Sequence, residues 1–241
     1  MKRLIIVKTG SKIPSLAGVD GDYEQWIARG LGKSVYPIAV VDAARGAPLP
    51  DPSTVAAIVI TGSAAMVTER AAWMEQGAAW LRGAVAAEVP LLGICFGHQL
   101  LAWALGGEVG YNPRGVEVGT ATIRLAVEAQ QDPLFSGMPA TFPAQVSHRQ
   151  SVLRLPAGAR LLAASDQEPH QAFAVGPCAW GVQFHPEFDA PIIRHFIEHY
   201  RERLLGEGDS AERLLGAVRD SPHSASLLGR FARLAQGAGG E

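Results

Sequence analysis

The first hundred residues alternate apolar runs with amphipathic segments, and this alternation restricts the fold more than any other feature. Uninterrupted or nearly uninterrupted apolar runs cover 3–9, 35–41, 55–61 and 91–94. Segments with apolar residues near helical spacing cover 22–31, 69–88 and 96–105. Such runs are typical of strands buried on both faces, and strand–helix alternation is typical of a parallel sheet. The sequence therefore predicts an α/β fold with a mostly parallel central sheet and helices on both faces.

The pattern changes after residue 108. Short β-prone runs follow one another at 120–125, 142–146, 161–164, 171–175 and 180–184, and a helical segment follows at 190–205. We expect a small antiparallel portion here. No repeat or flexible linker divides residues 1–205, which we interpret as one domain.

Residues 206–241, the C-terminal tail, have a different sequence pattern. A break at 206–209 precedes two short helical patterns at 211–218 and 224–235, each with an apolar stripe. We interpret 206–241 as a helical extension that packs on the domain or forms a subunit contact, such as that of a homodimer. Its last residues, 237–241, are expected to fray.

Composition excludes several classes of protein. The net charge of −2 gives no broad electrostatic reason to bind nucleic acid or an anionic membrane. Two cysteines exclude a disulfide scaffold and suit a reducing compartment. Lys8 interrupts the first apolar run, and no run approaches the ~18 residues of a membrane-spanning helix. We therefore expect a cytoplasmic protein.

Cys95 stands where an apolar strand runs directly into a helix. Gly93 and Gly97 lie two residues to either side of it, which is the spacing of a nucleophile elbow. Small neighbours permit the sharp turn, and the helix N-terminus favours a thiolate. The alternative is a small buried cysteine that only packs.

A second cluster, His185-Pro186-Glu187, lies at the end of the last β-prone run. Residues two apart on an extended chain point the same way, and Pro186 stiffens the segment. Glu187 can therefore orient one nitrogen of His185 while the other faces a thiol, which completes a nucleophile–base–orienter set. The alternative is a polar strand end with an incidental histidine.

Two motifs together make the chain resemble the class I, triad-type glutamine amidotransferase domain. They are Gly-Ile-Cys-Phe-Gly-His-Gln at 93–99 and Gly-Val-Gln-Phe-His-Pro-Glu at 181–187. Weaker matches lie at 60–63 and 146–148, and the resemblance covers roughly 3–205. It is closest to stand-alone members similar to the amidotransferase half of GMP synthase. The resemblance implies a flavodoxin-like fold.

The resemblance implies that Cys95 attacks the side-chain amide of glutamine and forms a γ-glutamyl thioester. His185 would transfer the protons, and Glu187 would orient it. The oxyanion would bind backbone N–H groups of Phe96 and of the Gly62-Ser63 turn.

The resemblance also implies a place for the two ends of the glutamine backbone. Gln99 and the backbone of Ser147 and His148 are expected near the α-amino and α-carboxylate groups. Glu117 is a weaker candidate for the same pocket.

The chain also departs from the family. Many members have Gly-Gly at the oxyanion turn, and many have an acidic residue two positions after Ser-His, where this chain has Gln150. No phosphate-binding loop of the G-x-x-x-x-G-K-[ST] kind occurs, so we expect any synthetase to act in trans.

We expect no cofactor and no metal, because His195 and His199 have helical ligand spacing but no third ligand.

Three functions remain open at this point. The first is a glutaminase that passes ammonia to a partner synthetase or another acceptor. The second is a hydrolase of γ-glutamyl peptides with the same triad, and the third is a regulatory subunit without catalysis. An intracellular peptidase of the related superfamily is a further alternative, although those more often have histidine where this chain has Phe96.

Overall fold

The central sheet combines a parallel half with an antiparallel half. A computed structural model describes residues 2–206 and 208–237. Within them, nine strands form one sheet in the order β2-β1-β3-β4-β11-β10-β9-β6-β7, and β5 pairs with β8 separately. The strands are β1 (Arg3–Lys8), β2 (Ile38–Asp42), β3 (Val55–Ile60), β4 (Leu91–Ile94), β5 (Glu108–Tyr111), β6 (Glu117–Leu125), β7 (Thr141–His148), β8 (Gln150–Arg154), β9 (Arg160–Ala164), β10 (Ala172–Val175) and β11 (Ala179–Val182). The first five strands of this order are parallel and have the flavodoxin-like 2-1-3-4-5 arrangement. The predicted fold class is therefore confirmed.

The two halves of the sheet meet at β11. This strand pairs in parallel with β4 and antiparallel with β10. The prediction that all late strands are antiparallel is thus wrong for β11, which belongs to both halves. β11 also ends at Val182, two residues earlier than predicted, and His185 joins the sheet edge through an isolated bridge to Gln145.

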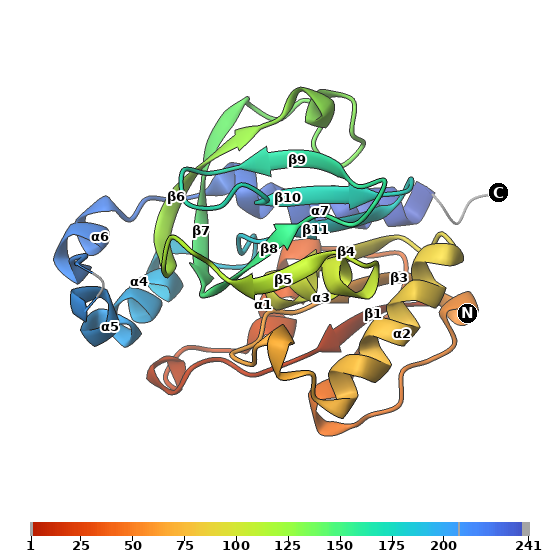
Figure 1. Cartoon of the computed structure of the whole chain (residues 1–241). Helices are drawn as coiled ribbons and strands as arrows, with labels where there is room; N and C mark the ends of the chain where they lie inside the picture. The colour runs from red at the N-terminus through yellow and green to blue at the C-terminus, as the bar shows by residue number, and fades with distance from the viewer. Residues whose placement is uncertain (1, 207, 238–241) are drawn as a thin grey trace.

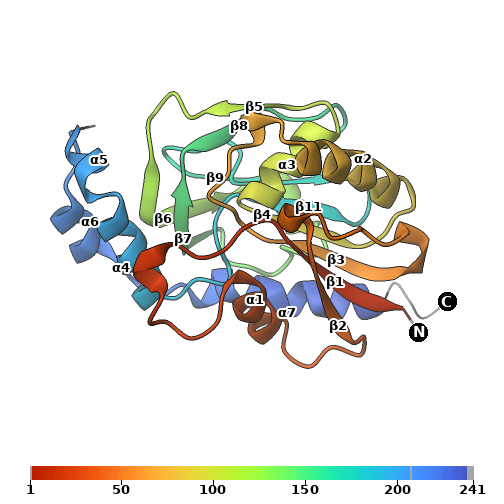
Figure 2. The ribbon, with the colours of Figure 1, turned by 90° about the horizontal axis from the view of Figure 1, so that it is seen from below.

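Helices cover both faces of the parallel half (Figures 1 and 2). α1 and α7 lie on one face, and α2 and α3 lie on the other. The helices are α1 (Tyr23–Leu31), α2 (Ala72–Ala86), α3 (Phe96–Ala104), α4 (Ala190–His199), α5 (Arg201–Gly206), α6 (Ala211–Ala217) and α7 (Pro222–Gly237). Among the described residues, none of these helices is long and apolar enough to cross a membrane.

Local signals fix some helix boundaries but not others. Asp22 caps α1 in a capping box with Gln25, as polar N-caps do. The helix predicted at 69–88 begins only at Ala72, because Arg70 has a left-handed backbone (φ 53°). The single helix predicted at 190–205 is two helices, α4 and α5, separated at Tyr200.

The C-terminal helices pack on the rest of the chain. α6 contacts β6 and α4, at the same side of the molecule as α5 (Figure 1). α7 contacts α1 and β7 and buries Leu227, Leu228 and Phe231 in the core cluster that also contains Ile6. The fraying expected at 238–241 lies outside the described residues, and Gly237 ends α7.

Replacing Phe231 by alanine tests how much α7 stabilises this core. The ring is fully buried and stacks edge-on against Trp180 at 6.3 Å. We expect Phe231→Ala to lower the free energy of unfolding by about 3–5 kcal/mol, measured by denaturant titration. The control is Arg233→Ala, an exposed position of the same helix, expected within ~0.5 kcal/mol of the parent. Equal values for both variants would mean that α7 does not contribute to the core.

Candidate active site

The carboxyl ends of three neighbouring parallel strands carry the residues that the motifs singled out. β3 leads into Thr61 and Gly62, β4 leads into Cys95, and β11 leads towards His185. Because β3, β4 and β11 are adjacent in the sheet, these residues gather at one edge. This edge is where α/β sheets usually bind their ligands.

The backbone of Cys95 is strained. Its φ of 50° and ψ of −100° lie outside the regions that non-glycine residues favour. The turn is tight because β4 and α3 nearly touch: a Cβ on Gly93 would lie 2.5 Å from the carbonyl oxygen of Gly97. A Cβ on Gly97 would in turn lie 2.8 Å from the carbonyl oxygen of Ile60. Both glycines are therefore required by close approach, as the sequence spacing indicated.

His185 is held by hydrogen bonding and by stacking. Its Nδ1 lies 2.8 Å from Glu187 Oε1, and its ring stacks on Phe188 with centroids 3.9 Å apart. Tyr23 of α1 stacks beyond it at 6.4 Å. His185 also donates its backbone N–H to Gln145. These contacts fix both the position and the plane of the imidazole.

Cys95 is close enough to His185 for its charge to act on the imidazole. Because Nδ1 of His185 is used by Glu187, Nε2 is the nitrogen available to the sulfur. Burial alone would lower the pKa of His185, but the charges of Glu187 and Cys95 and its hydrogen bonds to both raise that pKa well above its ordinary value. The arrangement can shuttle a proton between a thiol and a bound substrate.

The Gly62-Ser63 turn is rigid. Thr9 Oγ1 donates to the carbonyl oxygen of Thr61 or Gly62, and Ser63 Oγ donates to the carbonyl oxygen of Thr9 at 2.7 Å. A Cβ on Gly62 would lie 2.9 Å from His185 Cε1, so only a glycine lets the turn lie this close to the imidazole. Phe96 is the first residue of α3, where backbone N–H groups lack intrahelical acceptors.

A narrow pocket of ≈ 30 Å³ opens beside Cys95. Ser63, Phe96, Gln99, Ser147 and His148 all line it, together with Tyr200 and others. The carbonyl oxygen of Ser147 lies 3.7 Å from the sulfur of Cys95. The amide nitrogen of Gln99 donates to the carbonyl oxygen of Gln150 and to Gln183. Six of the ten sequence-predicted site residues therefore line this pocket, whereas Gly62, His185, Glu187 and Glu117 do not.

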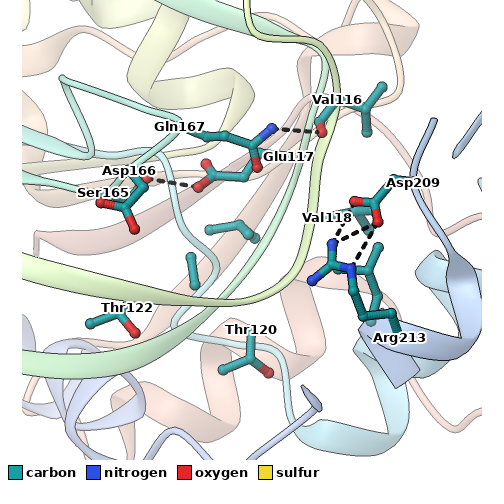
Figure 3. A pocket seen from close by; sticks show the side chains of 13 residues that line it. Val116, Glu117, Val118, Thr120, Thr122, Ser165, Asp166, Gln167, Asp209 and Arg213 are labelled. Atoms are coloured by element: carbon teal, nitrogen blue, oxygen red, sulfur yellow. Dashed lines mark hydrogen bonds and ion pairs between the residues drawn. The ribbon is translucent and has the colours of Figure 1, made fainter. Parts of the chain in front are cut away.

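Glu117 reaches this pocket only through His148. Its Oε2 lies 2.7 Å from His148 Nε2, and its Oε1 accepts from Ser165. Glu117 lines a different cavity, of ≈ 280 Å³, between β6 and α6, in which Asp209 and Arg213 are paired (Figure 3). It is thus placed to support His148 rather than to touch a molecule at Cys95.

Glu117 and His148 attract each other electrostatically in a buried setting. Burial lowers the pKa of His148, but the hydrogen bond to Glu117 and its charge outweigh this and raise the pKa to about 9. His148 Nδ1 donates to the carbonyl oxygen of Gln150 at 2.9 Å. The pair therefore fixes the end of β7, which carries Ser147.

Sequence reasoning missed four residues around the site: Tyr23, Phe188, Arg149 and Tyr200. Phe188 follows the His-Pro-Glu motif directly, so its proximity was a usable signal. The other three come from distant segments and carried no local signal. Among the described residues no cluster of three or more metal-ligating side chains occurs, and His195 and His199 gain no further ligand.

Comparison with protein families adds an independent finding. The family model described as glutamine amidotransferase class-I matches residues 19–195. A gamma-glutamyl peptidase 5 of Arabidopsis thaliana is 34% identical over 133 residues, 54% of this chain and 53% of that protein. One subunit of the glutamine-hydrolyzing GMP synthase of Methanocaldococcus jannaschii is 42% identical over 122 residues, 48% of this chain and 62% of that protein. Each match spans less than two thirds of the relative.

Solved structures agree on the fold. A crystal structure of a glutamine amidotransferase from Thermotoga maritima superposes with a TM-score of 0.73 over 100% of both chains, at 21% identity. At this identity the likeness concerns the fold alone.

Alkaline pH tests the Glu117–His148 pair. A histidine whose folded pKa is raised stabilises the protein fully below its unfolded pKa of ~6.5 and loses that contribution as pH rises through about 9. We expect the stability advantage of the parent over Glu117→Gln to shrink by roughly 2–3 kcal/mol between pH 6 and pH 10. The control is Glu108→Gln, which removes an exposed partner of Arg154. If the difference in unfolding free energy between the parent and Glu117→Gln stayed constant with pH, the raised pKa of His148 would be contradicted.

The contact between Gly62 and His185 gives a second test. Gly62→Ala should displace the imidazole and lower kcat by about 100-fold, because small misplacements of reacting groups are costly. Gly77→Ala in α2 is the matched control, since its Cβ would meet Leu100 at an ordinary 3.6 Å. Turnover is the measurement, with the melting temperature recorded beside it. Full activity in Gly62→Ala would show that this turn does not position His185.

Proposed function

The chain belongs to the glutamine amidotransferase class-I family, and on that premise we propose that it hydrolyses the γ-amide bond of glutamine or of a γ-glutamyl compound. Cys95 is the proposed nucleophile, His185 the acid and base, and Glu187 the orienter. The observation that carries the proposal is the strained Cys95 held against a histidine whose other nitrogen is bonded to a buried carboxylate.

In the first half of the proposed reaction, the sulfur of Cys95 attacks the γ-carbonyl carbon. The carbonyl oxygen becomes an oxyanion, which the N–H of Phe96 and an N–H of the Gly62-Ser63 turn stabilise. Removing one such donor costs about 3 kcal/mol in comparable enzymes. The raised pKa of His185 keeps its imidazolium available as the acid that protonates the leaving amine. The C–N bond breaks, and a γ-glutamyl thioester remains.

In the second half, a water molecule attacks the thioester carbon. His185, now neutral, takes a proton from the water, and the C–S bond breaks. Glutamate leaves, and the proton returns to the sulfur–imidazole pair. Glu187 keeps Nδ1 of His185 in the same hydrogen bond throughout, so that Nε2 always faces the reacting atoms.

Glutamine is the simplest substrate for this site, and its leaving group is ammonia. Similar proteins include subunits of glutamine-hydrolyzing GMP synthases, and this supports transfer of the ammonia to a synthetase partner or another acceptor in trans. The roles of Gln99, Ser147 and His148 in holding the α-amino and α-carboxylate groups belong to the same proposal, because all three line the pocket at Cys95.

γ-Glutamyl peptides are the second candidate substrate. A larger cavity that shares Arg149 with the pocket at Cys95 favours them, because it offers room for a leaving group bigger than ammonia. Two of the similar proteins are gamma-glutamyl peptidases. A purely regulatory role fits less well, because a chain without catalysis has no use for backbone strain at Cys95.

Covalent labelling tests the proposal most directly. The protein is treated with a diazo-ketone analogue of glutamine, and the modified peptide is identified by mass. We expect label on Cys95, blocked by excess glutamine or γ-glutamyl dipeptides, and none on Cys178, the half-buried second cysteine. Label on neither cysteine, at a concentration that labels a known member of the family, would reject the proposed nucleophile.

Turnover of variants extends this test. Cys95→Ala should lower kcat by on the order of 10³-fold or more, whereas Cys178→Ala should retain the parent rate. Glu187→Gln should fall between them, because it keeps a hydrogen-bonding group but removes the charge next to His185. An active Cys95→Ala enzyme would contradict the mechanism.

A further inference from the structure

A cavity of ≈ 230 Å³ adjoins the pocket at Cys95, and Arg149 belongs to the walls of both. The described residues that line it are Tyr111, Asn112, Gly115, Val116, Arg149 and Arg203. Two of them are arginines and none is acidic. A cavity with this lining attracts an anion.

Among the described residues, Arg149 is held in place without a carboxylate partner. Its Nε is buried and has no hydrogen-bond partner among the described residues, and its guanidinium lies 5.5 Å from the ring centroid of Tyr111. Its carbonyl oxygen accepts from the N–H of Asn112 at 2.9 Å, so the backbone is fixed. Arg203 has interactions of its own, so Arg149 is the residue that supplies the charge for a ligand.

The residue after Arg149 is uncharged. Gln150 begins β8, and its amide donates to Thr68 Oγ1 at 2.6 Å. This side chain therefore adds no negative charge beside Arg149.

Tyr200 connects this charge to the nucleophile. It lines the pocket at Cys95, and burial and the nearby sulfur raise the pKa of its hydroxyl, whereas Arg149 and Arg203 lower it. The charges of the sulfur and of both guanidinium groups thus act on the hydroxyl of Tyr200. Cys95, Tyr200 and Arg149 all line the same pocket, so a substrate bound at Cys95 can extend towards Arg149.

We propose that this cavity is a subsite for a carboxylate on the leaving portion of a γ-glutamyl peptide, held by Arg149. The inference rests on the proposed function, since it needs a γ-glutamyl carbonyl at Cys95. The peptide's C–N bond breaks, the amine of the released amino acid takes a proton from His185, and water completes the glutamate. Ammonia released from glutamine would leave the subsite unused.

The test compares two dipeptides that differ in one charge: γ-glutamylglycine and its C-terminal amide. We expect the parent enzyme to favour the free carboxylate by roughly 10–100-fold in kcat/KM, as charge-assisted hydrogen bonds do. Arg149→Gln should reduce this preference to near one, and Arg149→Lys should restore part of it. Arg154→Gln, which removes an exposed charge from the far end of β8, should keep the preference.

Two results would overturn the subsite. One is a parent enzyme with no preference for the carboxylate. The other is a uniform loss in Arg149→Gln with the preference kept, which would place Arg149 on the γ-glutamyl half instead.

Binding to Cys95→Ala, measured by calorimetry, separates this inference from the proposed function. A carboxylate preference in binding that depends on Arg149 supports the subsite even if the intact enzyme turns over neither dipeptide. No such preference in binding or in turnover rejects the subsite and leaves labelling of Cys95 unaffected.

Discussion

The architecture of the site depends on how closely α3 approaches the sheet. Bare Cα atoms at Gly93 and Gly97 let the helix lie against β4 and against the carbonyl of Ile60. This contact forces the chain to turn within one residue, and Cys95 takes the positive φ that the turn demands. Backbone strain of this kind persists only where the surrounding residues hold it in place. Here the surrounding residues belong to two buried core clusters. The nucleophile's position is therefore a consequence of packing.

The sequence predicted the parts of the fold that depend on neighbouring residues. β4 was located to the residue, and α1 begins at its Asp22 cap, because apolar runs and caps act locally. β5 and β8 escaped prediction, since each is short and is stabilised by pairing with a strand some forty residues away. The break at Tyr200 also had no local cause such as glycine or proline, and the side chain there points to the pocket at Cys95.

The same division applies to the candidate site. Cys95, His185 and Glu187 lie in two compact motifs, so their spacing was enough to propose them. The link from Glu117 to His148 joins residues 31 positions apart, and only the pairing of β6 with β7 brings them together. Arg149 carried no signal in the sequence, because its surroundings form a cavity from β5, the loop after β5, the β7–β8 turn and α5. Charges whose partners come from other elements cannot be assigned from one sequence.

The position of α7 has a consequence for how the protein is made. Chains grow from the N-terminus, so the strands and both motifs leave the ribosome before residues 222–237. Until then the face of the sheet that holds Phe231 and Leu228 lacks its cover. The nascent chain thus carries the nucleophile and its histidine while a large apolar surface is still open. Translation that stalls in this interval leaves an aggregation-prone product, and chaperones that bind apolar surface would protect it.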